Sequence, residues 1–236
     1  MVGNDPPAIS RAIIGKAVSS GATLAGIASV EALRESPSYR SYSKTTWPIR
    51  VKSVLVLALS HDPSDASLDW WDGEEGGSLG NRRLQTIADG LVPWIAEEFN
   101  IRATTLPYHV ERGGVFLKDA SVHAGLGIIG KNNLVVTPTH GPRIRLRAMF
   151  LEAELPQSGP IDFSPCDDCP MPCREACPQE AFKLGKYNRR RCEVQMDLDQ
   201  RGREFISQGG TGGVNPKFRI KYCRACELAC PVGKGH

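Results

Sequence analysis

The sequence predicts a mixed helix-and-strand domain of the α/β or α+β class, followed by a small cysteine-rich unit. Helical and strand-like patterns alternate along the N-terminal two thirds of the 236 residues, and all eight cysteines lie between Cys166 and Cys230. Apolar residues make up 41% of the chain and charged residues 23%, which is enough for a packed core. We expect two domains, residues 1–158 and 159–236, with a proline-containing linker at 156–165.

The N-terminal domain has the periodicities of both element types. Residues 52–60 form a continuous apolar run typical of a buried strand, and residues 143–150 alternate in a way that predicts a strand with one polar face. Residues 81–99 repeat apolar positions at helical spacing, with Pro93 predicted to kink or break the helix. The other predicted elements are helices at 8–20 and 115–124, strands at 23–28, 101–106 and 134–137, and loops at 62–80 and 209–213.

Charge and hydropathy exclude several classes of protein. The 29 basic and 26 acidic residues give a net charge of +3, so charge does not support tRNA or another nucleic acid as a partner. The longest apolar run, from Val54 to Leu59, is too short to cross a bilayer. The first residues lack the pattern of a secretion signal. We therefore expect a cytoplasmic protein without a membrane partner.

The cysteines form two dense groups that each end in Cys-Pro. The first reads Cys166-Asp-Asp-Cys169-Pro-Met-Pro-Cys173-Arg-Glu-Ala-Cys177-Pro, and the second reads Cys223-Arg-Ala-Cys226-Glu-Leu-Ala-Cys230-Pro. Both are close to the bacterial ferredoxin spacing, in which the Cys-Pro cysteine binds the other cluster. The crossed pattern predicts one [4Fe–4S] cluster on Cys166, Cys169, Cys173 and Cys230, and a second on Cys177, Cys192, Cys223 and Cys226.

Disulfides and zinc are the alternatives for these cysteines. Disulfides need an oxidising compartment, for which the sequence shows no targeting signal. Two zinc sites could also use eight thiolates, but the paired Cys-Pro endings favour iron and sulfur.

A glycine-rich segment, Gly125-Leu-Gly127-Ile-Ile-Gly130-Lys131-Asn132, matches two nucleotide-binding motifs only in part. A dinucleotide-binding loop follows a strand and precedes a helix, whereas here we predict a helix before and a strand after. A phosphate-binding loop needs a hydroxyl side chain where Asn132 stands. The glycines are expected to form a tight turn. The scattered histidines His109, His123 and His140 form no metal-binding motif.

Two passages resemble known enzymes. The segment Ala124-Gly-Leu-Gly-Ile-Ile-Gly-Lys-Asn-Asn-Leu134 is similar to the AGLGxxGKN segment of epoxyqueuosine reductases, and Gly141-Pro-Arg-Ile-Arg-Leu146 is similar to the GPRVRL segment of reductive dehalogenases. Both families place these segments before a double Cys-Pro region, and together they form one superfamily. The resemblance implies a nitroreductase-like core that binds a corrinoid, followed by a ferredoxin-like domain with two [4Fe–4S] clusters.

The resemblance also implies roles for individual residues. Glu111 lies near the position of the catalytic aspartate of epoxyqueuosine reductases, and Tyr108 is a second candidate because dehalogenases use a tyrosine as proton donor. The residues implied to lie next to the corrinoid are Gly125, Gly127, Gly130, Lys131, Asn132 and Asn133. Arg143 and Arg145 could bind corrin carboxamides or an acidic substrate group, or they could form a solvated strand face.

The implied activity is that of a cobalamin-dependent oxidoreductase. A low-potential donor of the ferredoxin or flavodoxin type would reduce the clusters, and the substrate would be a small molecule or a modified nucleoside. Two alternatives remain open: an electron-transfer or corrinoid-carrier protein without its own organic substrate, and a flavin-binding relative, since the nitroreductase-like core also occurs in flavin enzymes. The sequence does not identify the substrate.

Overall fold

The centre of the protein is a four-stranded antiparallel sheet with the strand order β1-β2-β6-β3. The structure, a computed structural model, describes residues 5–42, 47–62, 64–72, 77–207 and 217–234. The strands are β1 (Leu24–Ser29), β2 (Ser53–Ser60), β6 (Ile144–Leu151) and β3 (Ala103–Thr105). In β2, Val54 and Val56 enter one apolar cluster while Leu55 and Leu57 enter the other. Both faces are covered, which explains the continuous apolar run in the sequence.

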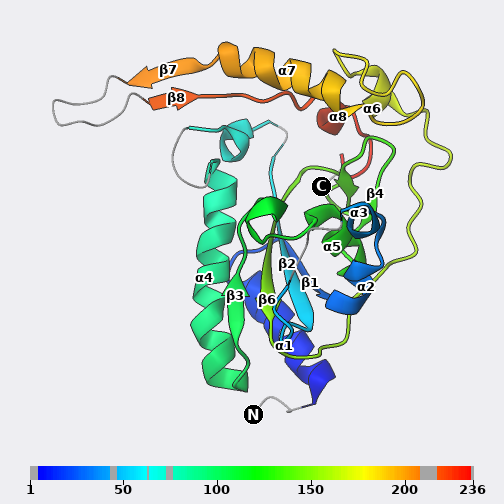
Figure 1. Ribbon diagram of the computed structural model, residues 1–236. Helices are drawn as coiled ribbons and strands as arrows, with labels where there is room; N and C mark the ends of the chain where they lie inside the picture. The colour runs from blue at the N-terminus through cyan, green and yellow to red at the C-terminus, as the bar shows by residue number, and fades with distance from the viewer. Residues whose placement is uncertain (1–4, 43–46, 63, 73–76, 208–216, 235–236) are drawn as a thin grey trace.

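Two helices cover one face of the sheet, α1 (Pro6–Ser19) and α4 (Leu79–Phe99) (Figure 1). Ser78 caps α4 by accepting a hydrogen bond from the backbone N–H of Asn81, and Asn100 ends the helix in the left-handed conformation. The helix continues through Pro93 rather than ending there. The long apolar stripe of α4 therefore packs along the sheet over its whole length.

Three shorter helices lie on the other face: α2 (Val30–Arg34), α3 (Pro37–Ser41) and α5 (Leu117–His123). Tyr39 is buried there between the rings of Trp47 and Phe116, each at 4.8 Å between centroids in an edge-on arrangement. Its hydroxyl accepts a hydrogen bond from the backbone N–H of Phe116. These contacts fix the start of α5, which is the element that leads into the glycine-rich segment.

The chain after β6 has much less regular structure. A long segment without helix or strand leads to three helices and a hairpin: α6 (Pro172–Glu175), α7 (Arg189–Arg201), α8 (Ala225–Leu228), and β7 (Glu204–Ser207) paired with β8 (Lys217–Arg219). Figure 1 shows α7 and the hairpin crossing one end of the core. Trp71 pairs with Ile220 through backbone hydrogen bonds, and Arg219 stacks on Trp70, so the hairpin is tied to the core.

Most predicted elements are confirmed within a few residues, including the mixed fold class. The glycine-rich segment has α5 before it and the strand β5 (Val135–Val136) after it, as the sequence predicts, and it also contains the strand β4 (Ile128–Ile129), which pairs with β5 and was not predicted. Two 3-10 turns, η1 (Ala66–Asp69) and η2 (Val110–Arg112), complete the described elements. The predicted loop at 209–213 lies outside the described residues. No helix in the described part of the chain has the length and apolar character of a membrane span.

Candidate functional site

The first group of thiols gathers around Cys173 on α6. Burial raises the pKa of Cys173, and the neighbouring thiols of Cys230, Cys169 and Cys166 raise it further. The turn that aims Cys169 is formed by Met171, which is left-handed at φ 56° and donates its backbone N–H to the Cys169 sulfur at 3.4 Å. These four side chains are therefore close enough to influence one another's ionisation.

The second group gathers around Cys226 on α8. Burial, followed by the thiols of Cys223, Cys192 and Cys177, raises the pKa of Cys226 to about 12. Cys192 comes from α7, and the Cys223 N–H is held by Asp199 of the same helix at 2.7 Å. All eight cysteines are free of disulfides.

The glycine-rich segment lies beside both thiol groups. A Cβ atom on Gly130 would approach the Cys166 sulfur to 3.6 Å, and the buried Asn132 donates from its amide to the Cys226 carbonyl at 3.4 Å. Gly125 and Gly127 are held by backbone contacts, because a Cβ on Gly127 would meet the Val136 carbonyl at 2.2 Å. Lys131 is exposed. Of the predicted segment, Asn133 reaches the cavity described next.

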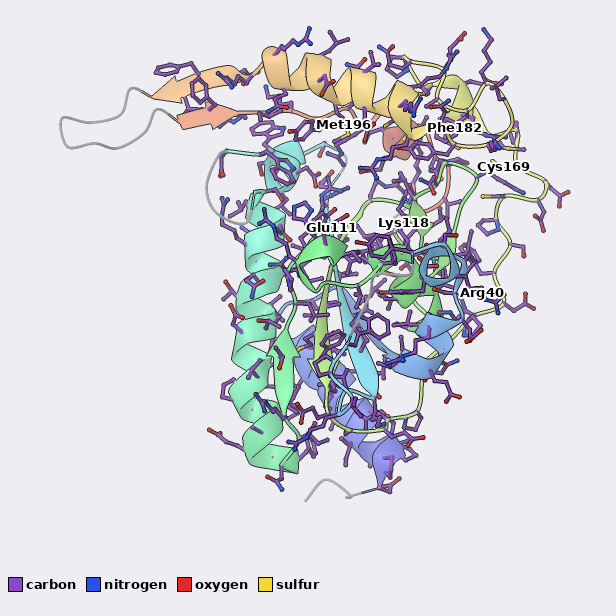
Figure 2. The ribbon with its side chains drawn as sticks, viewed as in Figure 1. Arg40, Glu111, Lys118, Cys169, Phe182 and Met196 are labelled. Atoms are coloured by element: carbon purple, nitrogen blue, oxygen red, sulfur yellow. The ribbon has the colours of Figure 1, made fainter. Side chains whose placement is uncertain are left out.

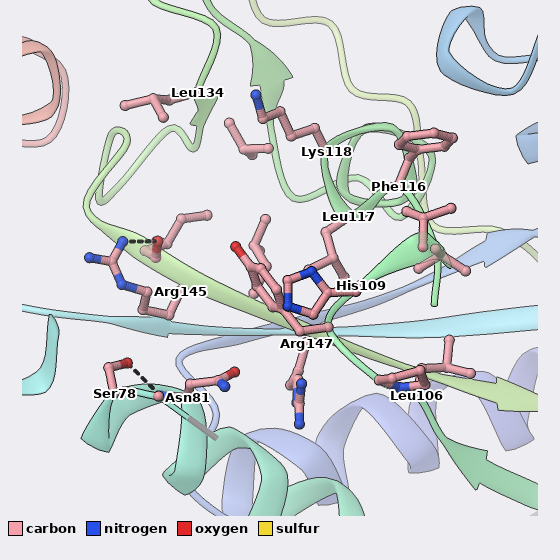
Figure 3. Close-up of a pocket in the computed structure, with 18 of the residues that line it drawn as sticks. Ser78, Asn81, Leu106, His109, Phe116, Leu117, Lys118, Leu134, Arg145 and Arg147 are labelled. Carbon is pink, nitrogen blue, oxygen red and sulfur yellow. Dashed lines mark hydrogen bonds between the residues drawn. The ribbon is translucent and has the colours of Figure 1, made fainter. Parts of the chain in front are cut away.

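A cavity of about 1330 Å³ opens between the core and the cysteine-rich part of the chain. The core supplies residues from β6, α4, the start of α5 and the 107–112 segment, and the C-terminal part supplies Met196, Tyr222 and Glu227. Figure 2 shows Met196 on α7 above the end of the core that carries Glu111 and Lys118. Figure 3 shows Lys118 and Leu134 on one side of the cavity and Leu106 and Arg147 on another.

Lys118 lines the cavity and lies close to thiols of the second group. Its ammonium donates to the Asn133 carbonyl at 2.6 Å, and burial lowers its pKa against the opposing influence of Asp119, Cys192 and Cys226. The sequence analysis missed this residue, because a single lysine in a short helix carries no pattern that distinguishes it from a solvent-exposed one.

A buried charged cluster connects the cavity wall to the core. His61 Nδ1 lies 2.9 Å from Asp69 and His61 Nε2 lies 2.7 Å from Glu227, while Arg224 and Arg145 pair with the same two carboxylates. Burial opposes ionisation of Glu227, but hydrogen bonds from His61 and Arg224 and the charge of Arg145 outweigh it and lower its pKa. The cluster attaches α8, and with it Cys226, to the end of β2.

The two predicted proton donors occupy different positions. Tyr108 lines the cavity and is half exposed, with its ring edge-on to His109 at 5.5 Å. Glu111 on η2 is exposed and does not line the cavity, although its neighbours Val110 and Arg112 do.

Two of the three arginines in the strand predicted at 143–150 are buried, Arg143 and Arg147, and Arg145 is partly buried, which corrects the expectation of a solvated face. Arg143, 2% exposed, donates to the carbonyls of Cys230 and Val232 and does not line the cavity. Arg145 lines the cavity while paired with Asp69 and Glu227. Arg147, which the sequence analysis did not single out, also lines the cavity and is 8% exposed.

Known proteins with similar sequences come from two families. The chain is 29% identical to the epoxyqueuosine reductase of Lactococcus garvieae over 171 residues, covering 69% of this chain and 43% of that protein. It is 29% identical to that of Pseudomonas aeruginosa over 161 residues, with coverages of 67% and 41%. It is 30% identical to the tetrachloroethene reductive dehalogenase of Sulfurospirillum multivorans over 125 residues, with coverages of 49% and 23%. No protein-family model matches the chain.

Solved structures give the same pair of families. An epoxyqueuosine reductase from Bacillus subtilis, solved with its catalytic aspartate loop swung out of the active site, superposes with a TM-score of 0.62 at 20% identity, covering 95% of this chain and 65% of that one. A catabolic reductive dehalogenase gives a TM-score of 0.62 at 18% identity, with coverages of 81% and 30%. The chain spans less than half the length of each of these two epoxyqueuosine reductases. Sequence similarity and a shared fold thus agree that this chain is similar to epoxyqueuosine reductases and reductive dehalogenases.

Proposed function

We propose that this chain is a reductase of the epoxyqueuosine reductase type, with two [4Fe–4S] clusters on its eight cysteines and a corrinoid in its cavity. The observation that carries the proposal is the division of the eight thiols into two groups of four, one of which adjoins the cavity. When bound, the clusters would supply low-potential electrons and the corrinoid a cobalt centre for the reductive step.

The residues present fit two clusters better than zinc. The first group would be Cys166, Cys169, Cys173 and Cys230, and the second Cys177, Cys192, Cys223 and Cys226. A cubane binds each thiolate to a different iron, so its ligands stand further apart than the four ligands of one zinc ion. In the described part of the chain, no three Cys, His, Asp or Glu side chains converge on a single-ion site. The spacing of the cysteines in the sequence, with a Cys-Pro at the end of each dense group, also supports clusters.

The cavity also suits a large macrocycle. Its volume of about 1330 Å³ exceeds the roughly 300–1000 Å³ of ordinary small-ligand pockets. Its wall combines apolar side chains such as Leu106 and Leu134 with polar groups such as Asn133 and Lys118. These are the groups that we propose contact the corrin ring and its amide side chains.

Two residues of this chain are proposed to handle the proton. Tyr108 already lines the cavity. Glu111 is exposed on η2. The Bacillus subtilis enzyme has been solved with its catalytic aspartate loop swung out of the active site, which shows that a loop with a catalytic carboxylate can change position in a similar protein. We propose that Glu111 reaches the cavity when its own loop turns inward over a bound substrate, where loss of water would favour its protonated form.

The substrate is proposed to be a small molecule or a modified nucleoside. An epoxyqueuosine reductase has been solved with an epoxyqueuosine-modified tRNA stem loop, and a dehalogenase with 3-bromo-4-hydroxybenzoic acid. Because the chain spans only 65% of the first of these structures and 30% of the second, neither ligand is assigned to it.

An acidic electron donor of the ferredoxin or flavodoxin type is proposed to approach residues 183–191. This segment carries five basic side chains and no acidic one, and its Leu184 is 77% exposed. It lies in the sequence between Cys177 and Cys192, both in the second thiol group. A basic surface with an apolar tip suits an acidic protein partner.

The test is anaerobic reconstitution followed by cobalamin titration. The proposal predicts about eight irons with matching sulfide per chain, electron paramagnetic resonance signals of reduced [4Fe–4S] clusters, and a change in the cobalamin absorption spectrum on binding. Zinc in place of iron would overturn it. Flavin bands without cobalamin binding would indicate the flavin-binding relative, and cobalamin binding without turnover of any small substrate would indicate a carrier.

A further inference from the structure

The described wall of the cavity has an excess of positive charge. It contains five cationic side chains, Arg82, Arg112, Lys118, Arg145 and Arg147, and two carboxylates, Asp119 and Glu227. Asp119 accepts a hydrogen bond from the Ser38 hydroxyl at 2.6 Å, and Glu227 belongs to the buried charged cluster around His61. Arg82 is itself paired with Asp72, and Arg145 is paired with Asp69 and Glu227. The excess of positive charge therefore rests on Arg112, Lys118 and Arg147, and the cavity suits a ligand that carries negative charge.

Arg147 differs from the two arginines that precede it, Arg145 on β6 and Arg143 directly before the strand. Arg143 is held by two backbone carbonyls and Arg145 by two carboxylates. Arg147 is 8% exposed, donates through Nη2 to the Gln85 side chain, and forms no ion pair with any residue that the structure describes. Its Nε is buried without a hydrogen-bond partner. Figure 3 shows its side chain running from β6 toward α4 at the edge of the cavity.

A buried guanidinium without a carboxylate partner is costly to maintain. The carboxylate of Asp89 favours the charged form of Arg147 only at longer range. Gln85 links the two residues, because its amide donates a hydrogen bond to Asp89 at 2.7 Å. The guanidinium is planar and presents several N–H donors in fixed directions, so two of them can meet the two oxygens of one acid group.

We propose that Arg147 is the centre of an oxyanion-binding subsite, which takes a carboxylate or phosphate group of the molecule held in the cavity. The proposal rests on the proposed function only in taking the cavity as the ligand site. The acid group could belong to the organic substrate or to the phosphate of the corrinoid nucleotide loop, and both present the same oxygen chemistry to Arg147. The rigid strand β6 and the bond to Gln85 hold the guanidinium ready for it.

The test is isothermal titration of the anaerobically reconstituted protein with paired probes. Chlorobenzoate is compared with chlorobenzamide, which has nearly the same shape without the charge. Cobalamin is compared with cobinamide, which lacks the nucleotide loop and its phosphate. Each pair is titrated into the wild type, Arg147→Gln, Arg147→Lys, and Arg112→Gln, a control that removes the same charge from an exposed cavity residue.

We expect one of the two probes that carry an acid group to bind about 10- to 100-fold more weakly to Arg147→Gln, with the matched probe that lacks the acid group unchanged. Loss for chlorobenzoate identifies a substrate subsite, and loss for cobalamin identifies the phosphate of the corrinoid. Arg147→Lys should retain part of the preference for the probe that carries the acid group over its matched probe. Arg112→Gln should reduce that preference by less than threefold.

Equal affinity of wild type and Arg147→Gln for both probes that carry an acid group would overturn the subsite. Thermal unfolding of each variant separates this result from misfolding. The chlorobenzoate pair is also titrated without corrinoid. If the protein binds no corrinoid, the proposed function is contradicted, but the affinities for this pair still test the subsite.

Discussion

The core and the cysteine-rich part of this chain are stabilised in different ways. The core buries two apolar clusters, one on each face of the sheet. After residue 160, the described buried residues are Cys173, Ala181, Phe182, Glu227 and Cys230, so little apolar surface is removed from water there. On the proposed function, thiolate–metal bonds would supply stability to that part, because such bonds contribute directly to folding. The proposal therefore predicts a core that is stabilised by apolar burial and a cysteine-rich part that folds around its cofactor.

Removal of iron should have the largest effect, because it should destabilise the cysteine-rich part and leave the core folded. Chelation of the reconstituted protein is expected to abolish protection from hydrogen exchange throughout α6, α7 and α8 while β2 and α4 keep theirs. Hydrogen exchange followed by mass spectrometry measures both regions in one experiment. Equal loss of protection in the two regions would show that the core also depends on the metal.

Glu111→Gln should lower the rate of turnover without changing the stability of the core or of the cysteine-rich part. We expect turnover to fall by about 100-fold or more, as for loss of a general acid, with iron content, cobalamin binding and thermal stability unchanged. Steady-state kinetics and metal analysis measure these quantities, and Glu98→Gln, which changes an exposed glutamate of α4, is the matched control. Normal turnover would remove Glu111 from the mechanism.

His61→Leu tests the connection between the two regions. It removes one member of a buried charged cluster and leaves Asp69 and Glu227 facing an apolar side chain, which should cost about 3 kcal/mol in the free energy of unfolding. Denaturant unfolding measures the cost. Exchange protection of α8 should fall before that of the core, and the opposite order would contradict a connecting role.

Leu57→Ala tests the core alone. Leu57 is fully buried in the cluster beneath α1 and α4, so its truncation should also cost about 3 kcal/mol, through lost burial and a cavity. Iron content after reconstitution should stay at the wild-type value, as measured by metal analysis on the folded variant. A parallel loss of iron would mean that the two regions fold as one unit.

Arg40→Gln should have the smallest effect. The Arg40–Glu35 pair is exposed, with side chains 67% and 71% accessible, so its loss should change the free energy of unfolding by less than about 0.5 kcal/mol. Denaturant titration measures this change, which serves as the reference for the larger losses of unfolding free energy expected for His61→Leu and Leu57→Ala.

The sequence was most informative where local pattern and tertiary structure agree. The apolar run of β2 and the helical stripe of α4 reflect burial directly, and the cysteine spacing indicated two groups of four. The helix α7 was missed because its polar residues leave it without buried positions in the structure. The burial of Arg143 and Arg147 could not be read from an alternating pattern, because covering by a distant segment depends on contacts between residues far apart in the chain.

The crossed arrangement of the cysteines has a consequence for biosynthesis. One thiol group contains both Cys166 and Cys230, and the other needs Cys223 and Cys226 in addition to Cys177. The second set of four is complete once Cys226 has been synthesised, whereas the first also needs Cys230. On the proposal that these thiols bind clusters, neither cluster can therefore be completed before translation has reached Cys226.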